Sequence, residues 1–519
     1  MSNRLLTIVL AAAGLVSSQV VGGRAPSPAP DASVVVKPLD SARVAELLNR
    51  LRVSDSAVCE LAGRAIINMG GWFYDDTPRP MPMPRPMPMP MPMPFAGPGH
   101  GSIPRPPRPA RPYRWFDGGW YDASSLGAFR AVLRDGNRCV RHIAARVVGR
   151  AGQLGSYELF VTLLRDPDPG IRENGALGLA ELGDDRGERP LTDALRDADA
   201  GVRATAVLGL GRLEHASSLA PLTAALDDPA VAVRRNAAWG IGALDLKSAV
   251  DALAKALKDA DADVRRMGAW GLGQVEDRAA VALLGRALAD PAADVRATAA
   301  WALGQIEDSA SVVPLAAAVK DKDANVRAAV AFALGAVDNH AGVAPLTALV
   351  RDADGAVRQT AAWALGNLDA AAAVTPLAGA LQDSDAAVRH TAAWALGEIN
   401  NAAAVAPLAA ALKSDAEPGV RATVAWALGA IASSEAVEPL KAAMRDSDAT
   451  VRRTAVWALA QIDDERADDA VRNAASEDRP ASRHYAPRVR VRPEDLSRAL
   501  TWLKEYERYR KSKQGRDQE

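Results

Sequence analysis

Aromatic residues recur between residues 239 and 457 at a fixed spacing of 31 residues, once 32. The series is Trp239, Trp270, Trp301, Phe332, Trp363, Trp394, Trp426 and Trp457. Tryptophan offers a large, rigid contact area with one polar edge, and it is enriched where proteins bind partners. The series, here called the tryptophan ladder, therefore predicts a binding surface. A second interpretation is that each ring lies flat over small residues and fills gaps between repeats, as aromatic residues at helical spacing commonly do. The sequence leaves both interpretations open.

Polar residues accompany the tryptophan ladder at fixed positions. They include Arg235, Asn236, Arg266, Met267, Gln274, Gln305, Gln359, Asn367, His390, Glu398 and Gln461. This set repeats no charge, and the whole chain holds 62 basic and 63 acidic residues. DNA would require a basic stripe. The composition therefore predicts a protein or peptide partner, with a glycan as an alternative, and no nucleic acid.

Methionine alternates with proline between residues 77 and 112, through Met81, Met83, Met87, Met89, Met91 and Met93. Thioether sulfurs are soft ligands that suit Cu(I). Strict alternation with proline stiffens the chain and splays the sulfurs apart. The segment is predicted to be a low-complexity spacer rather than a metal site, with a Cu(I)-binding exported protein as the alternative function.

The chain has two cysteines, Cys59 and Cys139. Each adjoins an equivalent valine on helices expected to be neighbours, so we predict a disulfide between them, with two buried thiols as the alternative. The sequence shows no glycine-rich phosphate loop, no metal-spaced Cys/His cluster and no serine motif at a strand-to-helix turn. It therefore predicts no catalytic residues and no cofactor.

A repeated unit positions all these residues. Taking a Val-Arg or Ile-Arg pair as its marker, copies begin at Val140, Ile171, Val202, Val233, Val264, Val295, Val326, Val357, Val388, Val420 and Val451. A fixed period of this length indicates a stacked repeat architecture. In one copy we expect a first helix over Val312–Val319, a turn over Asp321–Asn325 and a second helix over Val326–Val337.

Helical geometry assigns a role to each position of the second helix. Val388, Ala392, Leu396 and Ile399 fall within one arc and should form the core, whereas Trp394 should point away from it. Aspartates five and three residues before the valine, such as Asp383 and Asp385, are expected to cap the second helix. The arginine after each valine, from Arg141 to Arg452, should pair with loop aspartates; anion binding is the alternative.

The chain is predicted to contain six parts. They are a signal peptide (1–23), a flexible lead-in (24–39), a degenerate N-terminal helical unit (40–70), a largely disordered Pro/Met/Arg-rich insert (71–123), the repeat array (124–475) and a basic C-terminal segment with a capping helix (476–519). The apolar stretch in residues 5–16 is short for a membrane span. We therefore expect an exported protein, periplasmic or extracellular, with no integral span after signal removal; an uncleaved membrane anchor is the alternative. The sequence does not define the oligomeric state.

The repeated unit, D-x-D-x-x-V-R-x-x-A-A-W-A-L-G-x-I followed by A-V-x-P-L-x-x-A-L, resembles the HEAT repeat, specifically the short subclass named after phycocyanobilin lyases. This resemblance implies an all-α, right-handed solenoid, or superhelix, of about eleven repeats whose second helices line a concave groove. The subclass includes bilin lyases, a di-iron hydroxylase and many scaffolds. The hydroxylase resemblance implies His-Glu pairs, and no histidine here precedes a glutamate. We predict a non-catalytic scaffold or assembly factor of the cell envelope, with a protein-modifying enzyme related to bilin lyases as the alternative.

Overall fold

The computed structural model describes residues 41–52 and 123–477. These residues form helices and turns, and no strand occurs among them. The chain divides into two compact units, residues 1–463 and residues 464–519. In the second unit, the described part is the helix α26 (Glu465–Glu477).

The first unit contains eleven second helices, one for each predicted copy. They are α5 (Arg138–Ala151), α7 (Pro169–Leu182), α9 (Ala200–Leu213), α11 (Val231–Ala243), α13 (Ala262–Val275), α15 (Ala293–Ile306), α17 (Ala324–Ala336), α19 (Gly355–Asn367), α21 (Ala386–Ile399), α23 (Pro418–Ile431) and α25 (Ala449–Leu459). Each packs against the second helix of the next copy. The period therefore sets both the number of helices and their order in the stack.

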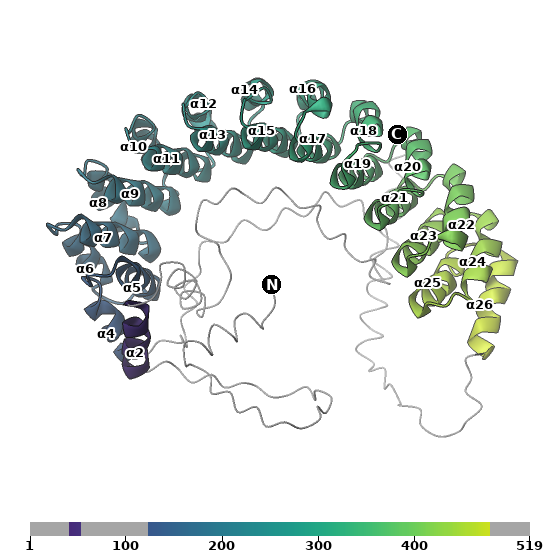
Figure 1. Cartoon of the computed structure of the whole chain (residues 1–519), viewed down its shortest axis with the longest axis horizontal. Coiled ribbons are helices and arrows are strands. Elements are labelled where there is room, and N and C mark those ends of the chain that lie inside the picture. Colours follow the sequence, from purple (N-terminus) through teal and green to yellow (C-terminus); the bar gives the residue numbers. More distant parts are fainter. Residues whose placement is uncertain (1–40, 53–122, 478–519) are drawn as a thin grey trace, which may run out of the picture. The chain divides into compact units, whose positions relative to one another are not determined.

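A shorter first helix precedes each second helix and packs on it. The first helices are α4 (Ala123–Ala131), α6 (Ser156–Leu163), α8 (Glu188–Ala194), α10 (Leu219–Ala225), α12 (Val250–Ala256), α14 (Val281–Ala287), α16 (Val312–Ala317), α18 (Val343–Leu349), α20 (Val374–Ala380), α22 (Val405–Ser414) and α24 (Val437–Ala443). Within this unit, Figure 1 shows the second helices as an inner row and the first helices as an outer row. The predicted all-α solenoid of eleven helix pairs is confirmed.

The core lies between the two rows. Val388, Ala392 and Leu396 are fully buried, and Ile399 is 7% exposed. The predicted core arc of the second helix is therefore confirmed. Because most core positions hold alanine, valine or leucine, the helices lie close enough that small changes in side-chain volume would be felt.

In the copy that begins at Val388, the second helix has a single capping aspartate rather than two. Asp385 is the N-cap of α21, and its carboxylate accepts a hydrogen bond from the backbone N–H of Ala387. Asp383 instead accepts from the backbone N–H of Asp385 and binds an arginine of the preceding copy. The prediction that both aspartates cap the helix was wrong for the first of them, because its carboxylate is engaged by that arginine.

Only part of the predicted N-terminal unit lies within the described residues. The helix α2 (Ser41–Arg52) packs on α4 and α5. Arg52 forms an ion pair with Asp135 at 2.5 Å between Nη2 and Oδ2. Predictions for the signal peptide, the Pro/Met/Arg-rich insert with its six methionines, Cys59 and the capping helix fall outside the described residues. No helix in the described part of the chain is long and apolar enough to span a membrane.

Candidate functional site

A series of arginines joins consecutive loops of the array. In nine copies, the arginine after the repeat valine or isoleucine binds an aspartate of the next copy, with Nε–Oδ2 distances between 2.6 and 2.8 Å. Arg358, for example, donates from Nε and Nη2 to Asp383. Its Nη1 donates to the carbonyl oxygens of Asp352 and Ala353 in its own loop. The predicted structural pairing is confirmed, since each guanidinium ties two successive loops together.

These ion pairs are partly shielded from water, and they lower the pKa of the carboxyl groups. The Arg358 and Asp383 side chains are 15% and 11% exposed. The hydrogen bond from Arg358 lowers the pKa of Asp383. The hydrogen bond from Arg421 likewise lowers the pKa of Asp446 to about 2. A lowered pKa means that the folded state favours the ionised carboxylate, so the arginine series contributes to stability.

The tryptophan ladder lies on the open side of the second helices. Here the residues two, six and ten positions after each repeat valine or isoleucine are called the ladder face; in one copy they are Gln359, Trp363 and Asn367. All eight aromatic residues of the ladder are partly buried, in contrast to the fully buried core positions of the same helices. Since neighbouring second helices cover two sides and first helices a third, the ladder face is the remaining side.

The rings also contribute to contacts between copies. A Cβ added to Gly366 would lie 3.0 Å from Cζ3 of Trp394 in the next copy, and 2.8 Å from Cβ of Ala395. A Cβ added to Gly397 would lie 2.7 Å from Cζ3 of Trp426. One edge of these rings therefore packs over a glycine of the preceding copy. The structure supports the packing interpretation for that edge, while the partial exposure keeps the binding interpretation open.

Two neighbouring rings of the ladder stack on each other. The ring centroids of Phe332 and Trp363 are 5.4 Å apart, and their planes differ by 5°. Of the ladder tryptophans, Trp270 has an indole nitrogen that is buried and makes no hydrogen bond. The ladder is thus continuous in sequence but not uniform in the surroundings of its rings.

Polar residues beside the ladder form hydrogen bonds between copies. Gln359 donates from Nε2 to Oγ1 of Thr391 in the next copy, at 3.3 Å. His390 Nδ1 lies 3.0 Å from Oγ1 of Thr423, again in the next copy. Burial lowers the pKa of His390, which favours the neutral imidazole. The other predicted residues, Gln305, Asn367 and Glu398, are partly buried on the ladder face.

The ladder face changes character in the first three copies, where Arg146, Leu177 and Leu208 take the aromatic position. Glu181, whose side chain is 5% exposed, lies 2.8 Å from Arg150 and 2.9 Å from Arg212. Its distance to Arg146 is 3.7 Å. Burial raises the pKa of Glu181, but the positive charges of the three arginines outweigh this effect and lower it.

Sequence reasoning missed this charged cluster. Arg150, Glu181 and Arg212 all stand ten positions after their repeat valine or isoleucine, at intervals of 31 residues. Residues at equal positions of neighbouring copies lie side by side in a stacked array. The alternation of charge at this spacing was therefore the signal that could have identified it.

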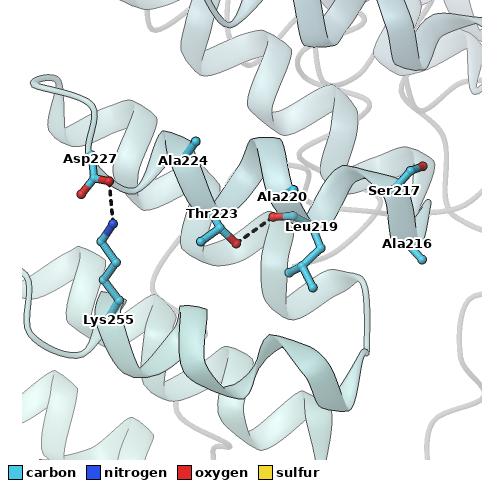
Figure 2. Close-up of a pocket in the computed structure, with 8 residues that line it drawn as sticks. All are labelled: Ala216, Ser217, Leu219, Ala220, Thr223, Ala224, Asp227 and Lys255. Atoms are coloured by element: carbon cyan, nitrogen blue, oxygen red, sulfur yellow. Dashed lines mark hydrogen bonds and ion pairs between the residues drawn. The ribbon is translucent and has the colours of Figure 1, made fainter.

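A shallow depression lies on the outer row, away from the ladder face (Figure 2). Ser217, Thr223, Asp227 and Lys255 contribute its polar groups. Lys255 Nζ pairs with Asp227 Oδ2 at 2.6 Å, and Thr223 donates to the carbonyl oxygen of Leu219. Ser217 donates to Glu188, outside the depression. The polar groups of the depression are thus already paired, and they form no convergent set for chemistry.

The described residues contain no group of three or more His, Cys, Asp or Glu side chains that could hold a metal ion. Cys139 in α5 is disulfide-bonded. Cys59, the other cysteine of the sequence, lies outside the described residues.

Comparison with known proteins identifies the repeat. A family described as HEAT repeats matches residues 188–269, 250–335, 281–355, 312–385, 343–421 and 405–486, which together span more than half of the chain. No curated protein matches the sequence.

Among solved structures, a chain from the study of Kap95p binding to RanGDP matches with a TM-score of 0.52 and 15% identity. Importin beta matches with a TM-score of 0.52 and 13% identity. The alignments cover 68% and 81% of this chain, but 58% of the Kap95p-study chain and 63% of importin beta. The CpcE–CpcF complex of phycocyanin lyase from Nostoc sp. PCC7120 aligns with 22% identity and a TM-score of 0.29, over 47% of this chain and 94% of that one. At these identities, the first two similarities show the shared fold.

Proposed function

Because the chain belongs to the HEAT repeat family, we propose that it is a non-catalytic scaffold that binds an extended polypeptide along the ladder face. The observation that carries this proposal is the run of partly exposed aromatic rings on eight successive second helices. Their rigid surfaces lie beside amide and imidazole side chains that can form hydrogen bonds with a peptide backbone. A protein partner also fits the Kap95p study, whose subject is binding to another protein, RanGDP.

Site-specific photo-crosslinking in the cells that produce the protein tests this function. A crosslinking amino acid is placed at Gln305 or Asn367 on the ladder face, and at Val313 as the control. Val313 is 77% exposed on α16 of the outer row, so it offers an accessible position away from the ladder face. Crosslinks to one protein partner from both ladder positions, and none from Val313, are the expected result. Crosslinks from Val313 alone would refute the proposal.

The cell envelope is the proposed place of action. This part of the proposal is supported by the sequence of residues 1–23, which has the basic start and short apolar stretch typical of a signal peptide. Fractionation of cells, followed by N-terminal sequencing of the mature protein, measures it directly. Recovery of the chain in the cytoplasm with its first residues intact would refute export.

A further inference from the structure

Charge is distributed unevenly along the ladder face. In the five copies that begin at Val140 through Val264, its positions hold five arginines and two glutamates, namely Arg146, Arg150, Arg212, Arg235 and Arg266 with Glu173 and Glu181. The next five copies hold no lysine or arginine there and one glutamate, Glu398, whereas the last copy, at Val451, again has an arginine, Arg453. The basic part overlaps the start of the tryptophan ladder, so arginine and tryptophan share the second helices α11 and α13.

Two equivalent arginines in the basic part differ in their surroundings. Arg266 on α13 is 4% exposed, and its Nη2 lies 2.9 Å from Oδ1 of Asp263, the second residue of that helix. The second residue of α11 is Ala232. Arg235 accordingly makes no hydrogen bond or ion pair with any residue that the structure describes, and its Nε is buried.

A carboxylate is the group that would satisfy Arg235. A buried guanidinium N–H without an acceptor is unfavourable, because it has lost its hydrogen bonds to water. The planar fork of donors on arginine matches the two oxygens of a carboxylate. Arg235 precedes Trp239 by four residues, so the two side chains lie on the same face of α11. A segment bound over Trp239 therefore passes beside Arg235.

We propose that the polypeptide bound along the ladder face is acidic over α11, and that one of its carboxylates pairs with Arg235. That carboxylate takes the place that Asp263 occupies one copy later. The inference rests on the proposed function. It adds the chemistry of the partner and the place along the ladder face where the acidic part of the partner lies. The acidic part of the segment lies over the basic copies from α5 to α13, and its neutral or apolar part lies over the aromatic copies from α15 to α23.

Binding of labelled peptides to the full chain, measured by fluorescence anisotropy, tests this inference. The probes are peptides of six Glu-Gly repeats and six Gln-Gly repeats. Arg235→Gln removes the guanidinium, and Ala232→Asp supplies it with an internal carboxylate at a position exposed in the first turn of α11. Asp is favourable at a helix N-terminus, so Ala232→Asp should fold. Ala356→Asp is the matched control, since it is the second residue of α19 and has Gln359 where α11 has Arg235.

The Glu-Gly peptide is expected to bind more tightly than the Gln-Gly peptide. Arg235→Gln and Ala232→Asp should each weaken its binding about fivefold, the effect of losing one partly buried charge pair, while Ala356→Asp leaves it within about twofold. Equal affinity for both peptides, no binding of either, or wild-type affinity in both variants would overturn the inference. Crosslinking from Gln305 and Asn367 does not depend on these outcomes, so an acidic preference can fail while the proposed function stands.

Discussion

Replacing Gly366 by alanine tests how closely the second helices approach each other. Gly366 lies in α19, and an added Cβ would be 2.8 Å from Cβ and 2.9 Å from Cα of Ala395, and 3.0 Å from Cζ3 of Trp394. The contacts with Ala395 involve the backbone of α21, which cannot rotate away as a long side chain can. The new methyl group therefore forces the two helices apart or displaces the indole ring.

Two opposing effects determine how much Gly366→Ala changes the free energy of unfolding. Alanine stabilises a helix by about 1 kcal/mol relative to glycine. Overpacking a close contact costs about 1–3 kcal/mol. Because three contacts at 3.0 Å or less arise together, we place the cost near its upper end and expect Gly366→Ala to lower the free energy of unfolding by about 2 kcal/mol.

Gly379→Ala is the matched control for this prediction. Gly379 lies in the first helix α20, and a Cβ added there would meet no atom within 4 Å. The substitution should therefore stabilise the protein by a few tenths to about 1 kcal/mol through helix propensity alone.

Urea unfolding followed by circular dichroism at 222 nm measures both variants. Repeat arrays unfold with contributions from each interface, so hydrogen exchange of α19 and α21 should accompany the titration. Faster exchange in these two helices is expected for Gly366→Ala. If Gly366→Ala instead stabilised the protein as much as Gly379→Ala does, the close approach of α19 and α21 would be refuted.

Substitutions at three further positions, with one control position, probe other parts of the array. Asp383→Asn should cost about 2 kcal/mol at pH 7, because it removes a charged, partly buried pair. Since folding lowers the pKa of Asp383, this contribution is fully present above the unfolded pKa of about 3.9 and is lost as the pH falls through the folded value. Unfolding midpoints of the wild type and Asp383→Asn should therefore converge as the pH falls below the folded pKa of Asp383. Asp227→Asn, in an exposed pair, should have an effect below about 1 kcal/mol at neutral and at acidic pH. Trp363→Phe should keep the free energy of unfolding within about 1 kcal/mol of the wild type, since phenylalanine naturally fills the equivalent position one copy earlier. Trp363→Ala should lower it by about 2 kcal/mol, because the ring packing is lost. Equal losses in the denaturation midpoints of the two variants would contradict ring packing. Glu181→Gln should cost about 3 kcal/mol, because three guanidinium groups then face an uncharged amide, and a thermal midpoint equal to that of the wild type would exclude a stabilising role for this carboxylate.

Much of the fold could be predicted because the repeat period constrains it. The valine and the residues four, eight and eleven positions later define a core arc by helical geometry alone, and Val388, Ala392 and Leu396 lie there fully buried. The arginine series followed from its recurrence with the loop aspartates. These features depend on the spacing within one copy or between adjacent copies, which the sequence displays directly.

The surroundings of the ladder rings could not be predicted in the same way. Helical geometry placed Trp394 away from the core, but the packing of its ring over Gly366 depends on the distance between two second helices. That distance follows from the close fit of Gly366 against Ala395, which belongs to another copy. The hydrogen bond from Gln359 to Thr391 depends on the same alignment of neighbouring helices. Periodicity identifies which residues share a face, whereas tertiary packing decides which of them meet.

Comparison of the copies with one another distinguishes the positions that are uniform from those that vary along the array. Positions that hold the array together are nearly uniform, because each copy meets the same neighbours; the arginine after the repeat valine or isoleucine is present in all eleven copies. The positions that precede and follow the aromatic residue on the ladder face are not uniform. Three consecutive copies place Ala328, Gln359 and His390 before it, and Ala336, Asn367 and Glu398 after it. Some of these side chains also join neighbouring copies, as Gln359 does with Thr391 and His390 with Thr423. If the ladder face binds a polypeptide as proposed, the variable positions beside the rings would distinguish one partner from another, and the rings would supply contact area that many partners could share.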